Sequence, residues 1–311
     1  MSENEPSPRW THRFIGRLRG APSGPTLVVV AALHGNEPAG LEAAARVLAR
    51  LRQDRTPLRG EVACLIGNLG ALGRGVRYQV KDLNRAWTAE RMQALDAAKF
   101  RTPWDAEDSE QVAMYQAIEQ IRRTARGPVT VLDLHTTSGE GPPFVIVSDT
   151  PSSREFGGRL GLTCVAGLVE RLGGMMLGAL AQTGIGGAVV ECGRTGSPES
   201  MEHAEAATWI ALVAAGLVEE SDLPHLGALR RLLAAARGTL PETVEIVHRH
   251  EIRPQDGFEM APGFRHFQLV QRGEVLAQDV RGDVVAPHSG YLLMPLYQGL
   301  GDDGFFLGRA P

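Results

Sequence analysis

The chain has 311 residues, of which 43% are hydrophobic and 22% are charged. It is therefore long and apolar enough to bury a full core, which excludes a disordered chain. Its formal net charge of -4 and isoelectric point near 6.2 provide no basic surface for nucleic acid, which we exclude as a partner.

The cysteines and the amino terminus bear on the compartment. Three cysteines without C-x-x-C spacing indicate neither a disulfide framework nor a thiolate zinc site, and they favour a reducing compartment. Residues 1–8 are polar and acidic with no apolar run after them, so we expect no signal peptide and a cytoplasmic protein. The longest apolar run, residues 206–218, is too short to span a bilayer and is interpreted as a buried helix, so no membrane partner is expected.

A strand, a turn and a helix are predicted near the start of the chain. Residues 28–33 form an apolar run that is typical of a central strand, and residues 39–51 favour a helix. His34 and Glu37 then lie in the turn between them, at the strand end where open α/β sheets bind ligands. Together they could hold Zn²⁺. A His-x-x-acid pair is expected about once by chance in this composition, and we interpret the second match, His248 with Glu251, as such.

The next segments predict a β-α-β start followed by a functional loop. Residues 61–66 form a second short apolar strand beside the first. A glycine-rich stretch leads to residues 77–85, a polar segment with no helix or strand period, and such loops can carry function. An amphipathic helix is predicted over residues 109–125.

The middle of the chain continues the alternation of strands and helices. Residues 129–135 form a strand that places Val131, Asp133 and His135 on one face. The remaining predictions are a strand over 144–147, a glycine-interrupted helix over 152–172, a strand over 186–191 that ends in Glu191, and a closing helix over 200–218. This alternation predicts an α/β fold with a largely parallel or mixed sheet.

The texture changes in the last quarter, where Gly, Pro and Asp turns separate short strands. The predicted strands are 243–250, 266–270, 274–276, 291–294 and 305–307. We therefore expect two domains, a catalytic domain over 1–222 and an all-β domain over 223–311, with the boundary in residues 220–240.

Five residues have side chains suited to a zinc site and lie at or near predicted strand ends. Catalytic zinc commonly has three protein ligands and an open fourth position, which His34, Glu37 and His135 would satisfy. Asp133 could accept a hydrogen bond from the imidazole of His135. Glu191 is the candidate general base, since a water activated at the metal must lose a proton.

Four motifs, taken in order, resemble the succinylglutamate desuccinylase/aspartoacylase family of zinc carboxypeptidase-like hydrolases. They are His34-Gly-Asn-Glu37, Asp82-Leu-Asn-Arg85, Asp133-Leu-His135 and Val190-Glu-Cys-Gly193. The resemblance covers residues 26–218. It implies a zinc-carboxypeptidase-like mixed sheet flanked by helices, and the C-terminal strands fit the family's smaller β domain by arrangement.

The resemblance also implies residue roles. His34, Glu37 and His135 would bind one Zn²⁺, and Glu191 would act as general base and acid. Asn84 and Arg85 would hold a substrate carboxylate, while Arg77 would polarise the scissile carbonyl.

The sequence departs from the family at two places. Some aspartoacylases have a further substrate arginine where this chain has Ala181, with Arg171 and Arg194 as candidate substitutes. A C-terminal tyrosine reaches the site in some members, and neither Tyr291 nor Tyr297 matches it securely.

The sequence thus predicts a zinc-dependent hydrolase that cleaves the amide of a small N-acyl amino acid or related carboxylate. A metallocarboxypeptidase or an esterase of the same fold is the first alternative. A metal-containing binding module without turnover is the second, against which Glu191 argues because a binder needs no proton shuttle. The acyl group, the amine and whether the chain is a homodimer stay open.

Overall fold

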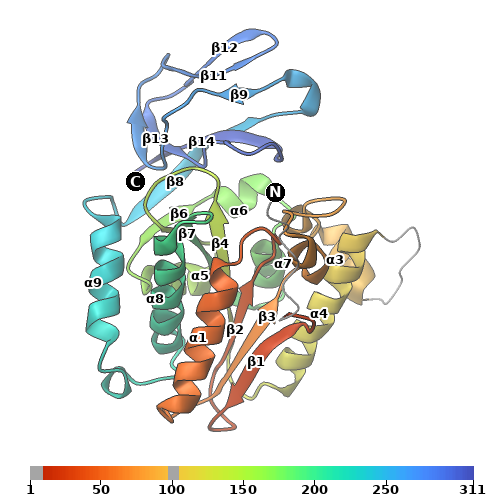
Figure 1. Cartoon of the computed structure of the whole chain (residues 1–311), viewed down its shortest axis with the longest axis vertical. Helices are drawn as coiled ribbons and strands as arrows, with labels where there is room; N and C mark the ends of the chain where they lie inside the picture. The colour runs from red at the N-terminus through yellow and green to blue at the C-terminus, as the bar shows by residue number, and fades with distance from the viewer. Residues whose placement is uncertain (1–9, 97–104) are drawn as a thin grey trace, which may run out of the picture.

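One mixed sheet runs through the molecule. The structure, a computed structural model, describes residues 10–96 and 105–311. Eleven strands pair in the order β1-β3-β2-β4-β7-β5-β6-β8-β14-β13-β10 (Figure 1). In that order their bounds are Phe14–Arg19, Glu61–Ile66, Thr26–Ala31, Val129–Thr137, Gly186–Arg194, Phe144–Ile146, Thr163–Ala166, Thr243–Glu251, Asp303–Arg309, Gly290–Leu293 and Gln268–Val270.

Four central strands position the site. β3, β2, β4 and β7 are parallel to one another, so their carboxyl ends meet at the same edge of the sheet. β5 runs antiparallel to β7, and β6 and β8 continue parallel to β5. The predicted α/β fold with a mixed sheet is therefore confirmed.

Helices cover both faces of the central sheet (Figure 1). Alternate residues of β2 pack into different cores: Leu27 and Val29 join one cluster with Trp209, while Val28 and Val30 join another with Met114. The first face carries α1 (Ala39–Gln53), α5 (Pro151–Gly158), α8 (Pro198–Ala214) and α9 (Leu226–Arg237). The second carries α3 (Ala89–Asp96), α4 (Ala106–Thr124) and α7 (Met176–Gln182). Burial on both faces explains why β2 is apolar from Leu27 to Ala31.

The predicted helix over residues 152–172 is wrong. The segment forms α5, strand β6 and the short helix α6 (Leu168–Leu172). Gly161 and Gly167 both have φ of 77°, a backbone conformation that separates these elements and that residues with a Cβ rarely adopt. The apolar run of β6 was therefore mistaken for part of a helical face.

Several elements were not predicted. β1 pairs antiparallel with β3 at the sheet edge. Helix α2 (Leu69–Arg74) forms within the glycine-rich stretch, because the side chain of Asn68 caps it by accepting a hydrogen bond from Ala71 N. Helix α7 was also missed, and α9 lies in residues 220–240, the segment expected to contain the domain boundary.

The predicted smaller C-terminal β region is present. β8, β14, β13 and β10 extend the main sheet by antiparallel pairing. A second sheet, in the order β12 (Gly282–Val285), β11 (Val275–Asp279) and β9 (Glu259–Met260), encloses a separate apolar core with them. A domain boundary at residue 222 stays a prediction. Among the described residues, no helix is both long enough and apolar enough to cross a bilayer.

Candidate active site

His34 and Glu37 lie in the turn between β2 and α1. Ala32 adopts a positive φ of 53°, which turns the chain as it leaves the strand. The turn packs tightly on α2, since a Cβ on Gly35 would lie 2.1 Å from the carbonyl carbon of Ala71. Within this turn, His34 Nδ1 lies 2.9 Å from Glu37 Oε1. Both side chains therefore lie between a strand and a helix, as the sequence predicted.

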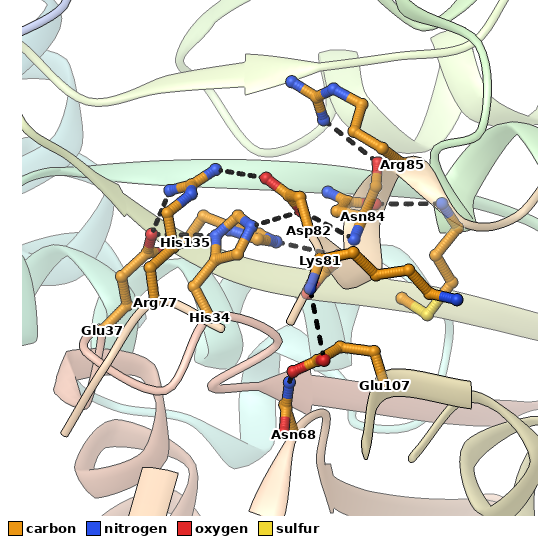
Figure 2. A network of polar contacts seen from close by, with 12 residues as sticks. His34, Glu37, Asn68, Arg77, Lys81, Asp82, Asn84, Arg85, Glu107 and His135 are labelled. Atoms are coloured by element: carbon orange, nitrogen blue, oxygen red, sulfur yellow. Dashed lines mark hydrogen bonds and ion pairs between the residues drawn. The ribbon is translucent and has the colours of Figure 1, made fainter. Parts of the chain in front are cut away.

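His135 reaches the same carboxylate from β4, the strand beside β2. Its Nδ1 lies 3.1 Å from Glu37 Oε2, and the backbone N–H of Thr136 donates to that oxygen at 3.0 Å. One donor atom from each of His34, Glu37 and His135 lies within 4.8 Å of the others, and all three residues are buried. Figure 2 shows these side chains turned toward one another. They form a group that could hold a metal ion.

A second carboxylate holds the far nitrogen of each imidazole. His34 Nε2 lies 3.0 Å from Asp82 Oδ1, and His135 Nε2 lies 3.1 Å from Asp133 Oδ2. Metal-binding histidines are usually oriented by such an acceptor, which leaves the other ring nitrogen for the metal. The arrangement therefore directs the two Nδ1 atoms to one point. Sequence reasoning proposed Asp133 for this contact but gave Asp82 no role.

Arg77 lies between Glu37, one of the three possible metal ligands, and Asp82. Its Nη2 donates to Asp82 Oδ2 at 2.9 Å, and its Nη1 lies 3.4 Å from Glu37 Oε1 (Figure 2). Burial alone would lower the pKa of Arg77, but the carboxylates of Asp82 and Glu37 outweigh it and raise that pKa. Burial would likewise raise the pKa of Asp82, yet His34 and the neighbouring arginines hold it well below its ordinary value. Arg77 is thus a fixed cation beside the cluster.

Glu107 of α4 fixes the loop that carries Arg77 and Asp82. Its carboxylate accepts from the backbone N–H groups of Gln79 at 2.8 Å, Val80 at 2.9 Å and Lys81 at 3.3 Å, and from Asn68 Nδ2 at 3.2 Å. Figure 2 shows Glu107 beneath the loop. This fully buried carboxylate explains how a segment without regular structure keeps one conformation.

Asn84 and Arg85 lie on the 3₁₀ turn η1 (Leu83–Arg85). The amide oxygen of Asn84 accepts from Met176 N at 3.0 Å, which anchors the turn to α7. Arg85 Nη2 lies 3.2 Å from Asp303 Oδ2 at the start of β14, and Nη1 donates to the carbonyl of Asn84. The C-terminal β region therefore contacts a predicted site residue directly.

Glu191 lies on β7 directly beside His135, its partner in the parallel register. Only 5% of the residue is exposed, and its Oε2 has no hydrogen-bond partner among the described residues. Burial raises the pKa of Glu191 to about 7, assisted by the Glu37 carboxylate and opposed by His135, His34 and Arg77. The strand continues three residues beyond Glu191, to Arg194.

A cavity lies over these residues and brings together all seven predicted site residues, namely His34, Glu37, Arg77, Asn84, Arg85, His135 and Glu191. Arg171 and Arg194 are outside it. Arg171 donates to Ile246 O and Arg194 pairs with Glu140, so neither lies where a substitute substrate arginine was expected. Tyr291 and Tyr297 do not line the cavity either.

The C-terminal region nevertheless supplies one wall of the cavity. This wall includes His266, Met294, Asp302, Asp303 and Phe306, none of which sequence reasoning selected. His266 Nδ1 accepts from Met294 N at 3.0 Å. Burial lowers the pKa of His266 to about 4, against a smaller opposing contribution from the Gly139 backbone, so the ring is neutral near pH 7.

His34, Glu37 and His135 are the one group of potential metal ligands found in the part of the chain that the structure describes. His248 and Glu251 belong to no such group. Residues 23–215 match the model of the succinylglutamate desuccinylase/aspartoacylase catalytic domain. The chain belongs to this family.

The family comprises hydrolases of the deacylase type, which the predicted enzyme class anticipated. Among curated relatives, succinylglutamate desuccinylase of Burkholderia pseudomallei (strain 1710b) is 29% identical over 133 residues, which is 41% of this chain and 37% of that protein. The enzyme of the same name from Photorhabdus laumondii is 40% identical over 60 residues, 19% of this chain and 18% of that protein. The matches thus span well under half the length of these relatives.

Solved structures of low sequence identity share the fold over nearly the whole chain. A succinylglutamate desuccinylase/aspartoacylase from Rhodobacter sphaeroides has a TM-score of 0.67 at 18% identity, covering 94% of this chain and 87% of that one. The ectoine utilization protein EutE (DoeB) from Ruegeria pomeroyi has a TM-score of 0.65 at 18% identity, with coverages of 94% and 88%. The C-terminal β region is therefore part of the shared fold.

Proposed function

We propose that the protein is a zinc-dependent deacylase that hydrolyses the amide bond of a small N-acyl amino acid or related carboxylate. One observation carries this proposal. Three buried ligand-type side chains converge, each imidazole is held by a second carboxylate, and a buried carboxylate with an unpartnered oxygen lies beside them.

The donor set fits one Zn²⁺. His34 and His135 would ligate through Nδ1 and Glu37 through its carboxylate, the mixture of nitrogen and oxygen donors typical of catalytic zinc with an open fourth position. When bound, the ion would supply Lewis-acid polarisation of the substrate carbonyl and lower the pKa of a water molecule. The remaining work falls to the chain's own side chains.

Glu191 would move the proton. Its Oε2 would accept a proton from the attacking water as the new C–O bond forms, and would return that proton to the amine nitrogen as the C–N bond breaks. The products are a free carboxylic acid and a free amine. Because Glu191 and His135 are register partners on adjacent strands, the shuttle is fixed relative to the metal group.

Arg77 would stabilise the oxyanion that develops on the carbonyl oxygen, since it is a buried cation already held in place by Asp82. Arg85 would bind the substrate carboxylate, because a planar guanidinium suits paired hydrogen bonds to that group. Asn84 would assist from the same turn. Its amide oxygen is taken by Met176 N, so the NH₂ end is the one able to donate to a ligand.

The test is release of free amine from a panel of N-acyl amino acids by the zinc-loaded protein. We expect amide hydrolysis that is lost on chelation and regained with Zn²⁺. Parallel assays on peptides and on matched esters test the two related alternatives. Release of C-terminal residues from peptides without deacylation would identify a carboxypeptidase, whereas zinc binding without any turnover would identify a binding module.

A further inference from the structure

The cavity changes character across the sheet. The order β2, β4, β7, β5 places His34 and His135 first, then Glu191, then the side chains of β5. On β7, Val189 lies on the same face as Glu191, and its register partner on β5 is Ile146. The lining of the cavity therefore changes along the sheet. The possible metal ligands His34, Glu37 and His135 come first, Glu191 follows, and an apolar surface comes last.

This apolar surface is formed by close-packed side chains. It consists of Ile146, Leu168, Leu172, Met175, Val189 and Phe306, which come from β5, α6, the start of α7, β7 and β14. All six pack in or against one buried core cluster, so the surface is the side of a close-packed core that faces the cavity. Such a surface favours an apolar ligand group and penalises burial of a charged one.

The cationic side chains that line the cavity also favour a substrate with a single carboxylate. Among the described residues that line it, the arginines are Arg77 and Arg85, and lysine is absent. Arg77 already pairs with Glu37 and Asp82, and Arg85 with Asp303. Under the proposed function Arg77 stabilises the oxyanion, so Arg85 is the one arginine of this lining that is left for a substrate carboxylate, and a second carboxylate would have none.

The apolar surface begins beside that arginine. Met175 lies between Gly174 and Met176, both of which approach the turn that carries Arg85. A Cβ added to Gly174 would come within 2.3 Å of Arg85 O, and the N–H of Met176 donates to Asn84. Leu172 ends α6 three residues before Met175. An amino acid whose carboxylate is held by Arg85 therefore has the apolar surface within reach of its side chain.

We propose that the substrates are N-acyl derivatives of amino acids with apolar side chains, carrying a single carboxylate. The inference rests on the proposed deacylase function and specifies its amine product. The carboxylate binds at Arg85, the scissile amide lies between the three possible metal ligands and Glu191, and the amino-acid side chain packs on Leu172 and Met175.

The decisive comparison is between N-acetyl-L-leucine and N-acetyl-L-aspartate, whose side chains are similar in shape but differ in charge. We expect kcat/KM of the zinc-loaded protein to favour the leucine compound by about tenfold or more, the range for placing an apolar group in an apolar pocket. N-succinyl-L-glutamate should be poorer still. Calorimetric binding of both acetyl compounds to Glu191→Gln should show the same preference without turnover.

A charge placed on the surface should reverse the preference. In Leu172→Arg, the leucine-to-aspartate ratio of kcat/KM should shift by about tenfold or more toward aspartate, because the new cation can pair with the second carboxylate. The ratio is independent of how much protein folds. The matched control is Leu269→Arg on β10, a residue that is 63% exposed and does not line the cavity, and its ratio should equal that of the wild type.

The outcomes separate this inference from the proposed function. A wild-type preference for N-acetyl-L-aspartate or N-succinyl-L-glutamate would overturn the inference and leave the deacylase intact. An unchanged ratio in Leu172→Arg would also overturn it, by showing that the side chain binds elsewhere. Absence of amine release from every compound would overturn both.

Discussion

Asp303 on β14 forms an ion pair with Arg85 on η1, with 3.2 Å between Asp303 Oδ2 and Arg85 Nη2, although 218 residues separate them in the sequence. The other carboxylate oxygen of Asp303 accepts from Arg249 Nε of β8 at 2.6 Å. Asp303 is therefore held between two arginines. Through this contact the C-terminal β region orients a proposed substrate-binding residue.

Replacing Asp303 with Asn should raise KM for the substrate by about threefold to tenfold, because a partly exposed ion pair contributes about 1 kcal/mol to the orientation of Arg85. Zinc content and kcat should change little. Steady-state kinetics measure both constants, with Asp283→Asn on the exposed β12 strand as the control. Equal KM values for the wild type and Asp303→Asn would mean that Arg85 needs no support from β14.

Glu107 provides a prediction about stability. In Glu107→Gln the new NH₂ group faces backbone donors, so at least one partly buried backbone N–H of residues 79–81 loses its acceptor, which should cost about 1 to 3 kcal/mol. Urea unfolding measures the difference. Glu119→Gln on the same helix is the matched control, since Glu119 pairs with the exposed side chains of Arg122 and Arg123. Unfolding of both variants at the same urea concentration would show that Glu107 does not hold the loop.

His266 predicts a pH dependence of stability. Burial lowers its pKa to about 4 in the folded protein, so as the pH falls the unfolded chain takes up the proton first, near its ordinary value of 6.5. This contribution to the unfolding free energy is complete above about pH 6.5 and is lost progressively toward pH 4. The loss is about 2 kcal/mol at pH 5. His266→Gln retains an acceptor for Met294 N and should lack this component. Unfolding free energies of both proteins at about pH 7.5 and 5 give the difference, and parallel pH profiles would contradict it.

The proposed ligand set predicts which histidine substitutions remove the bound zinc. His135→Ala should lose most bound zinc, because it removes one of three ligands and leaves Asp133 without its imidazole partner. His248→Ala, from the second His-x-x-acid match, should keep it. Elemental analysis of the purified proteins measures zinc directly. Full zinc content in both His34→Ala and His135→Ala would rule out this site.

The sequence was sufficient to predict the side of the sheet where the site lies. His34 follows β2, while His135 and Glu191 lie near the carboxyl ends of β4 and β7. Because the carboxyl ends of parallel strands meet at one edge of the sheet, the proximity of these residues follows from the pattern. The prediction of helices and strands failed at segments rich in glycine, because glycine can either separate two elements or lie within a helix. Gly161 and Gly167 separate β6 from its neighbouring helices, whereas the glycines of α2 lie in or beside a helix that Asn68 caps.

Contacts from distant segments could not be predicted in this way. Asp303 is the first residue of β14. The alternation of residues along a strand predicts which side chains are buried, but it does not predict the partner of a polar side chain. The pairing of Asp303 with Arg85 therefore depends on the order of strands in the whole sheet. Asp82 stood within a recognised motif, and only the folded loop shows that it faces His34. His266 lies in a turn whose sequence carries no signal for the cavity.

Glu191→Gln tests the central claim most directly, since it separates an enzyme from a metal-binding module. Glu191 is outside the ligand set and the substitution is nearly isosteric, so zinc content and circular dichroism should match the wild type. Turnover of the best N-acyl amino acid should fall by at least the ~10²-fold typical of lost general acid/base catalysis. A Glu191→Gln protein with normal zinc and normal turnover would contradict the account, because the proton would then be moved by another group.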